Sequence, residues 1–119
     1  MTTYLFVTGK EFRPERVQSG EDLWWSCSST TIEDDSILVY VKGEGIVYEW
    51  RATSAAERHD EWKFACNVEY VRTFEPGISL GDIRGLFPKK QWAAPYQNFR
   101  GYRSIRIPLE VARQLHQLR

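Results

Sequence analysis

The chain has 119 residues, of which 42% are hydrophobic, and its 16 basic and 16 acidic side chains give a formal net charge of zero. This length fits one domain with one core, and the composition argues against a disordered chain and against general attraction to polyanions. No apolar run reaches the roughly 20 residues that span a membrane, and residues 1–4 lack the pattern of a signal peptide. We therefore expect a cytoplasmic protein with no membrane partner.

The first half of the chain predicts short strands. Residues 4–7 form an apolar first strand, and residues 10–22 are a polar loop with room for one helical turn. Residues 23–27 form a second strand that leads into a Ser-rich turn. The β-branched runs at 37–41 and 46–50 flank a Gly-containing loop, which is the pattern of a hairpin.

The second half adds one long strand and two helices. Alternation of apolar and polar residues over 62–71 predicts a half-buried strand, which Pro76 and Gly77 should end. Ser79 is a candidate N-cap for a short helix that ends at Leu86. Residues 87–103 are irregular, and residues 104–107 form a last short strand. A helix that starts at Pro108 has an apolar stripe made of Val111, Ala112, Leu115 and Leu118.

These elements do not alternate as strand, helix, strand, so the pattern argues against a doubly wound parallel sheet. It favours a curved sheet or open barrel with helices at its ends, which is an α+β arrangement.

No motif indicates catalysis or metal binding. Cys27 and Cys66 lack a C-x-x-C spacing, so we expect free thiols. The cluster at 59–61, His-Asp-Glu, has too few soft ligands for a zinc site. The acidic run at 33–35 is typical of a solvated turn rather than an acid–base pair. The sequence predicts no cofactor, no metal and no enzymatic activity of the chain by itself.

The zero net charge conceals an asymmetry. Residues 1–79 carry 8 basic and 14 acidic side chains, whereas residues 80–119 carry 8 basic and 2 acidic ones. Either two oppositely charged parts of one fold neutralise each other, or the last third forms a basic face suited to phosphates. The charge count does not decide between the two.

Two segments combine aromatic and polar side chains. In the strand at 24–28, Trp24 and Trp25 should point to opposite faces, so one can be core while the other faces a groove. The loop at 91–103 concentrates aromatic rings, arginines and amides. Aromatic rings stack on bases, hydroxyls and amides bind base edges, and arginines bind phosphates. For any one tryptophan, core packing is the alternative interpretation.

The segment Trp25-Ser26-Cys27-Ser28, followed by residues 35–46, resembles EVE domains. The late pattern Trp92…Pro95…Asn98-Phe99-Arg100-Gly101, with residues 105–108 before a terminal helix, resembles them too. EVE domains belong to the PUA-like superfamily, together with YTH readers of methylated adenine and ASCH domains. The resemblance covers about residues 22–118. It implies one α+β domain over residues 1–119, a PUA-like open β-barrel (pseudo-barrel) with short helices packed at its ends.

The resemblance also implies a site in which the mouth of the barrel holds a flipped, modified base. It places Trp25, Ser26 and Cys27 on one wall of an aromatic pocket. The opposite wall and its rim would consist of Trp92, Asn98, Phe99 and Arg100. Whether Trp24 or Trp25 faces the base stays open. No nuclease segment is attached, so a restriction or RNA-processing role would need a partner protein.

The resulting hypothesis is a module that binds a modified base in DNA rather than RNA. Trp25 and Trp92 would stack on the base, Ser26 and Asn98 would read its edge, and basic residues would contact phosphates; these are Lys42, Arg100 and Arg103. The alternatives are an RNA-binding PUA-like module, a protein-interaction module, or a small hydrolase acting on a modified nucleoside. The hydrolase would require a Lys or Glu at the pocket.

Overall fold

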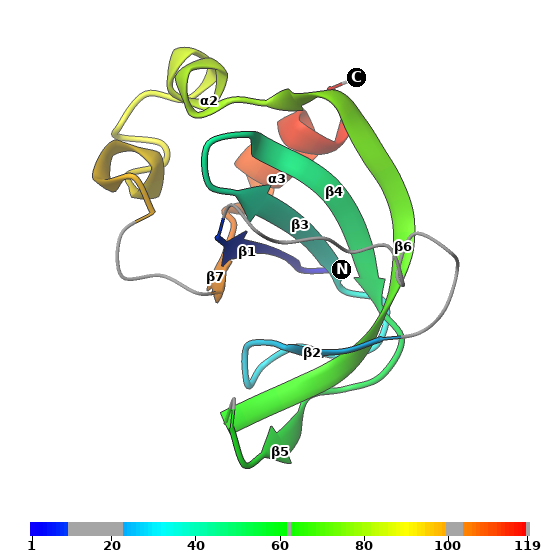
Figure 1. Cartoon of the computed structure of the whole chain (residues 1–119). Helices are drawn as coiled ribbons and strands as arrows, with labels where there is room; N and C mark the ends of the chain where they lie inside the picture. The colour runs from blue at the N-terminus through cyan, green and yellow to red at the C-terminus, as the bar shows by residue number, and fades with distance from the viewer. Residues whose placement is uncertain (10–22, 62, 100–103, 119) are drawn as a thin grey trace.

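The computed structural model describes residues 1–9, 23–61, 63–99 and 104–118, and Figure 1 shows their arrangement. A mixed, curled sheet forms a half-barrel, and short helices pack against it. The predicted α+β, PUA-like pseudo-barrel is therefore confirmed. The predicted loop at 10–22 and the predicted strand residue Trp62 lie outside the described residues.

Seven described strands make up the sheet. They are β1 (Thr3–Thr8), β2 (Leu23–Ser26), β3 (Ser36–Val41), β4 (Gly45–Ala52), β5 (Glu57–His59), β6 (Lys63–Ile78) and β7 (Ser104–Arg106). Their spatial order is β2-β6-β4-β3-β1-β7, and β5 pairs with β6 beside the end of β4. β1 and β3 run parallel, and the other described pairs are antiparallel. Among these strands, β5 was not predicted, because its three residues carry no apolar alternation.

Both faces of the sheet are covered in its middle. Every residue of β3 is buried, and its side chains alternate between two separate apolar clusters. Leu38 and Tyr40 join the first cluster, whereas Val39 and Val41 join the second. A continuous apolar run is typical of a strand that is buried on both faces, and this explains the composition of residues 37–41.

The first cluster attaches the helices to the sheet. α2 (Leu80–Leu86), the short 3₁₀ helix η1 (Ala94–Gln97) and α3 (Leu109–His116) are the described helices. Ser79 caps α2 as predicted, because its hydroxyl accepts a hydrogen bond from the backbone N–H of Asp82 at 3.1 Å. In α3, Val111, Ala112 and Leu115 are buried against the sheet, as their spacing predicts.

The second cluster fills the inside of the curl. Phe6 of β1, Trp50 of β4 and Cys66 of β6 are buried in it, and Trp25 of β2 packs against them. The Trp25 ring meets Phe6 and Trp50 edge to face, with centroids 5.6 Å and 5.7 Å apart. Edge-to-face contacts of this kind stabilise aromatic pairs beyond the area that they bury. β2 is thereby held across the open side of the curled sheet.

The long strand β6 continues past the point where it was expected to stop. The prediction that Pro76 and Gly77 end this strand is wrong. Between the pairs Ile46–Ile78 and Tyr48–Thr73, β6 has four residues where β4 has one. Proline has no N–H to donate to a neighbouring strand, and at a bulge no such hydrogen bond is required. The strand can therefore continue through Pro76.

A half-buried polar network ties α3 to the sheet. The Glu49 carboxylate of β4 accepts a hydrogen bond from Arg72 Nε at 2.8 Å and lies 3.5 Å from His116 Nδ1. Arg72 also donates to the backbone carbonyl of His116 at 2.9 Å, and His116 Nε2 lies 3.1 Å from the Thr3 hydroxyl. Burial by itself would raise the pKa of Glu49, but the hydrogen bonds and positive charges of His116 and Arg72 outweigh it and lower that pKa.

The network makes stability depend on pH in the acid range. A carboxyl whose pKa is lowered by folding stabilises the fold above its unfolded pKa, and this contribution is lost as the pH falls through the folded value. The Glu49→Gln variant should therefore be less stable than the parent at pH 7, and the difference should shrink below pH 4.5, the ordinary pKa of this carboxyl. Urea denaturation at several pH values measures it.

The exposed Glu44 in the β3–β4 turn supplies the control, because Glu44→Gln should change the free energy of unfolding little at any pH. A Glu49→Gln deficit of the same size at pH 3 and at pH 7 would contradict the role given to the network.

Candidate functional site

A pocket of about 310 Å³ opens where β2, the start of β6 and the start of β7 meet. This volume is at the lower end of the range for small-ligand pockets, about 300–1,000 Å³. Its lining combines three hydroxyls, one thiol, one aromatic ring and two opposite charges. The lining residues are Ser26, Cys27, Ser28, Glu61, Lys63, Phe64 and Ser104.

Strand pairing brings these distant segments together. Ser26 at the end of β2 pairs with Ala65 of β6, and the Cys27 backbone N–H donates to the Phe64 carbonyl at 3.2 Å. At the other side of the pocket, Ser104 pairs with Phe6 of β1, whose ring contacts Trp25 of β2. The pocket therefore lies at one end of the second apolar cluster.

A chain of hydroxyls holds the turn that follows β2. The Tyr4 hydroxyl lies 2.6 Å from the Thr30 hydroxyl, which in turn lies 3.1 Å from the Ser28 hydroxyl in the pocket lining. The same turn is supported by Asp35, whose carboxylate accepts from the backbone N–H of Thr2 at 3.0 Å and of Ile32 at 2.9 Å. β1 and this turn together give Ser28 a fixed position.

The acidic run at 33–35 is only partly the solvated turn that the sequence predicts. Glu33 and Asp34 are exposed, but Asp35 has only 2% of its surface exposed. Burial of Asp35 is tolerated because backbone N–H groups satisfy both of its carboxylate oxygens. Its role is to hold the turn, and this leaves no pair of carboxylates for acid–base chemistry there.

Trp24 and Trp25 separate as strand alternation requires. Trp25 points into the curl and packs on Phe6 and Trp50. Trp24 has 44% of its surface exposed and does not line the pocket. Of the two, Trp25 lies behind the pocket, beside Cys27, which packs against the same cluster.

The two cysteines are free thiols; Cys27 directly follows β2, and Cys66 lies on the neighbouring strand β6. Cys27 lines the pocket, whereas Cys66 is fully buried beneath it. A hydrogen bond from the Cys66 thiol lowers the pKa of Cys27, although burial acts in the opposite direction. The same hydrogen bond, together with burial, raises the pKa of Cys66. Cys27 is therefore the more acidic thiol, and it stands at the pocket.

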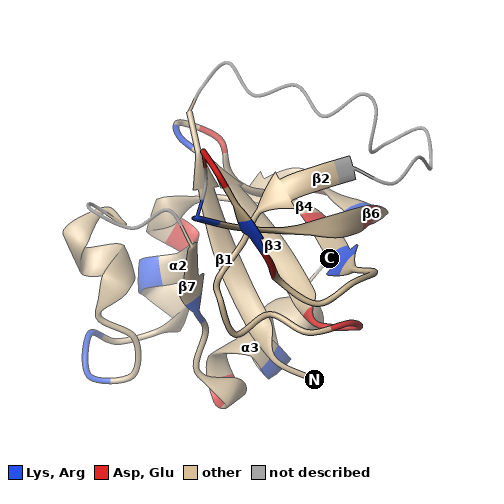
Figure 2. Cartoon of the chain, turned by 90° about the horizontal axis from the view of Figure 1, so that it is seen from below, with Lys and Arg blue, Asp and Glu red and all other residues tan. Residues whose placement is uncertain are grey.

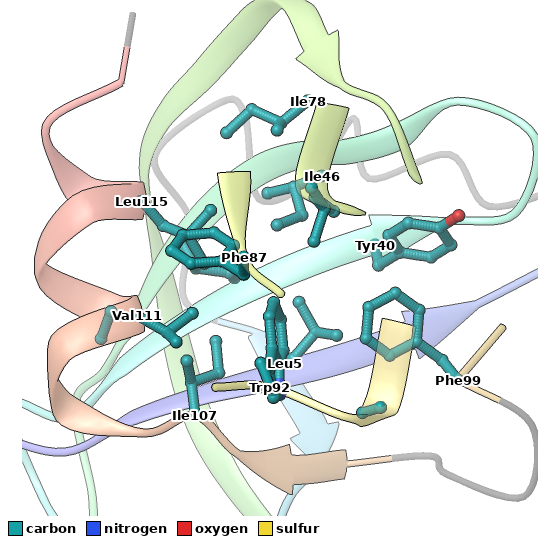
Figure 3. Close-up of a cluster of buried hydrophobic side chains, with 14 of the residues drawn as sticks. Leu5, Tyr40, Ile46, Ile78, Phe87, Trp92, Phe99, Ile107, Val111 and Leu115 are labelled. Atoms are coloured by element: carbon teal, nitrogen blue, oxygen red, sulfur yellow. The ribbon is translucent and has the colours of Figure 1, made fainter. Parts of the chain in front are cut away.

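The residues predicted for the second pocket wall lie elsewhere. Trp92 has 4% and Phe99 has 2% of its surface exposed, and both belong to the first apolar cluster (Figure 3). The Trp92 ring lies 5.6 Å from Phe99 and 6.0 Å from Phe87, measured between centroids, and Phe99 lies 4.8 Å from Tyr40. In this arrangement the Trp92 side chain is packed among the other rings of the first cluster.

The Asn98 side chain also makes contacts within the protein. Asn98 ends η1 with a left-handed backbone, φ 55°, and its side-chain oxygen accepts a hydrogen bond from Arg84 of α2. Arg84 Nε also donates to the Pro95 carbonyl at 3.0 Å. The Tyr96 hydroxyl completes the clamp by donating to the carbonyl of Phe87 at 2.9 Å. These contacts hold η1 on α2, and Asn98 does not line the pocket.

Among the predicted phosphate contacts, only Lys42 is described. It is exposed in the β3–β4 turn, and it does not line the pocket. Figure 1 shows this turn beside α2, at the end of the sheet away from β2 and β5. Arg100 and Arg103 lie outside the described residues. Figure 2 shows basic positions on α2, on the loop after it and on β7.

Sequence reasoning missed five lining residues, among them Ser28, which it named only as part of the motif that carries the resemblance. Ser104 was predicted only as the start of a strand. Glu61 was assigned to the polar cluster at 59–61, and Lys63 and Phe64 to the alternating strand at 62–71. The sequence did contain one signal for this part of the pocket. Acidic Glu61 and basic Lys63 stand at the start of the stretch 62–71, where apolar and polar residues alternate most regularly. The close approach of this segment to Ser26 depends on the pairing of β2 with β6, which local sequence does not reveal.

The described part of the chain contains no cluster of three or more His, Cys, Asp or Glu side chains that would hold a metal ion. None of its helices is long and apolar enough to cross a membrane.

Solved structures share this fold. Protein PSPTO5229 from Pseudomonas syringae superposes with a TM-score of 0.77 at 14% identity, over 96% of this chain and 97% of that one. Human THYN1, in complex with DNA containing 5-methylcytosine, gives a TM-score of 0.77 at 12% identity, over 97% and 95%. The YTH domain of Zygosaccharomyces rouxii MRB1, in complex with N6-methyladenosine RNA, gives 0.54 at 13% identity, over 97% and 85%. No protein-family model and no curated protein matches the sequence. The structural likenesses confirm the pseudo-barrel fold predicted from the sequence.

The buried position of Trp92 predicts a structural effect for its removal. Trp92→Ala should lower the free energy of unfolding by about 3–5 kcal/mol, because the truncation leaves a cavity between Phe87 and Phe99. Trp24→Ala, at an exposed position, should change it by less than about 1 kcal/mol. Denaturant unfolding measures both. Equal stability of the Trp92→Ala variant and the parent would show that Trp92 is not core.

The thiol arrangement predicts selective alkylation. In the folded protein, iodoacetamide should label Cys27 and spare Cys66, because the thiolate is the reactive form and only Cys27 has a lowered pKa and access from the pocket. Peptide mapping by mass spectrometry identifies the labelled residue. In a Cys27→Ser variant, labelling should require denaturant. Equal labelling rates at the two cysteines of the parent would contradict this arrangement.

Proposed function

We propose that this protein is a nucleic-acid-binding module that receives a modified nucleobase in the pocket formed by β2, β6 and β7. The single observation that carries the proposal is the pocket itself. At one end of the curled sheet, hydroxyls from Ser26, Ser28 and Ser104 surround an opening beside the Phe64 ring. An apolar surface with a few convergent polar groups is the usual composition of a site for a small planar ligand.

The fold supports the same conclusion independently. THYN1 is described in complex with DNA that contains 5-methylcytosine, and the YTH domain of MRB1 with N6-methyladenosine RNA. Both share the curled sheet of this chain over more than nine tenths of its length. Because one fold can serve different functions, the pocket chemistry and not the likeness alone must carry the assignment.

In the proposed complex the base lies against Phe64 and the sulfur of Cys27, and hydroxyls contact its edge. Ser26 and Ser104 are suited to this role because both line the pocket and a hydroxyl can donate or accept a hydrogen bond. Trp25 acts from behind, since it fixes β2 on the sheet. Trp92, Asn98 and Phe99 then contribute by holding the helical side of the fold rather than by touching the base.

The proposal also specifies the type of nucleic acid, the absence of turnover and the need for a partner protein. DNA is favoured over RNA, the chain binds without chemical turnover, and a partner protein supplies any restriction or RNA-processing activity. Backbone contacts come from exposed basic residues in the last third of the chain, where Lys89, Lys90 and Arg106 are described. Lysine and arginine contacts to phosphates give affinity that falls steeply with salt.

A pocket-filling variant tests the proposal. The parent should bind one modified oligonucleotide from a panel carrying cytosine, 5-methylcytosine, 5-hydroxymethylcytosine, adenine or N6-methyladenine in DNA and in RNA. Ser26→Phe should weaken that binding by at least about tenfold, since a base stacked in such a site contributes about 1–3 kcal/mol. Fluorescence anisotropy at fixed salt gives the dissociation constants.

Ser29→Phe is the matched control, because Ser29 is exposed in the neighbouring turn and does not line the pocket. Equal affinity of the Ser26→Phe variant and the parent would place the base outside this pocket. No binding by the folded parent to any member of the panel would contradict the proposed function.

One observation also favours a second candidate function. A nucleoside hydrolase would need a Lys or Glu at the pocket, and Lys63 and Glu61 both line it. Incubation with a panel of modified nucleosides, followed by chromatography of the products, separates the two functions. Turnover that is lost in Glu61→Gln would favour the hydrolase, whereas binding without turnover favours the module.

A further inference from the structure

We infer that Glu61 and Lys63 determine which bases the pocket accepts, and that they select a base with an exocyclic amino group next to a ring acceptor. Cytosine and adenine, with or without a methyl group, have this edge. The inference rests on the proposed function and adds the chemical class of the ligand and the residues that select it.

The other polar groups of the pocket cannot make this distinction. The hydroxyls of Ser26, Ser28 and Ser104 can each donate or accept a hydrogen bond, so they adapt to any base edge. A carboxylate only accepts, and an ammonium group only donates. Discrimination between donor and acceptor patterns therefore falls to Glu61 and Lys63.

The two charged side chains are available for this role. Both residues are exposed, both line the same pocket, and within the described part of the chain neither forms an ion pair. This differs from Arg51, Arg72 and Arg113, which are each paired with a carboxylate. Opposite charges in one pocket that are not paired with each other leave one acceptor and one donor facing a ligand.

The backbone supports the same interpretation. Glu61 lies in the turn between β5 and β6, and its N–H donates to His59 Nδ1 at 3.2 Å. Lys63, the first residue of β6, has φ 67°, a left-handed conformation that residues other than glycine adopt uncommonly. Such strain is concentrated at ligand-binding sites, where surrounding contacts hold it.

The base edges differ in what they offer to this pair. Cytosine presents its N4 amino group as a donor beside the N3 acceptor, and adenine presents N6 beside N1. A carboxylate accepts from such an amino group, while an ammonium donates to the neighbouring acceptor. Thymine and uracil present an acceptor, O4, where cytosine presents a donor, so their O4 would face the carboxylate of Glu61 without a hydrogen bond.

The experiment replaces the hydrogen-bond acceptor at position 61, the Glu61 carboxylate, with a donor. The parent and Glu61→Lys are titrated with oligonucleotides that differ at one position, which carries cytosine, 5-methylcytosine, adenine, thymine or uracil. The parent should bind the amino bases at least about tenfold more tightly than thymine or uracil, and Glu61→Lys should reduce or reverse that ratio. The ratio is the readout because an added lysine strengthens phosphate binding to every oligonucleotide equally.

Glu57→Lys adds the same charge on β5 of the same hairpin, at an exposed residue that does not line the pocket, and should leave the ratio unchanged. Lys63→Glu should also lower the ratio, while Arg58→Glu, at the exposed β5 residue that pairs with Phe64 and does not line the pocket, should not.

The outcomes separate the two proposals. An unchanged ratio in Glu61→Lys, or a parent that prefers thymine or uracil, would overturn this inference while the binding function stands. A folded parent that binds none of the oligonucleotides would overturn the proposed function and this inference with it.

Discussion

The 16-residue strand β6 is the constraint on which the arrangement depends. Its first residues pair with β2 on one side and β5 on the other, and from Val68 to Ile78 it pairs with β4. Because sheets twist, a strand of this length carries its two ends in different directions, and the sheet that follows it must curl. The curl sends β2 across the open side, where Trp25 packs on Phe6 and Trp50. The pocket is the space that remains between the end of β2 and the start of β7.

The two apolar clusters lie on opposite faces of the sheet, one under the helices and one inside the curl. In the cluster under the helices, Trp92 packs on Phe87 and Phe99, and none of these three residues lines the pocket. The cluster inside the curl ends at Cys27 beside the pocket. A ligand bound at the pocket would therefore meet the inner cluster directly and the helical cluster only through the sheet. The helices and the pocket thus lie on opposite faces of the sheet, and the side chains of β3 alternate between the two clusters.

Periodicity predicted the elements well because their signals are local. The hairpin at 37–50, the Ser79 cap and the stripe of the last helix each follow from a few neighbouring residues. The second pocket wall was harder to predict from the sequence. The local sequence around Trp92, an aromatic and Arg-rich loop, is the same whether its ring faces a base or the core. Trp92 became core because η1 is clamped to α2 by Arg84, a contact over 11 residues. Glu61 and Lys63 entered the site through the pairing of β2 with β6, which joins residues about 40 positions apart. Such long-range pairings are what a single sequence specifies least directly.

The most direct test of the central claim is an NMR titration of the isotope-labelled protein with a bound modified oligonucleotide, with backbone amide shifts assigned. If the base enters the pocket formed by β2, β6 and β7, the largest shift changes fall on residues 26–28, 61, 63, 64 and 104. Amides of α2 and η1 should move little, because Trp92 and Phe99 stay packed. Changes concentrated at residues 91–99, with the amides of Ser26 to Ser28 unmoved, would contradict the account and return the base to the loop that contains Trp92.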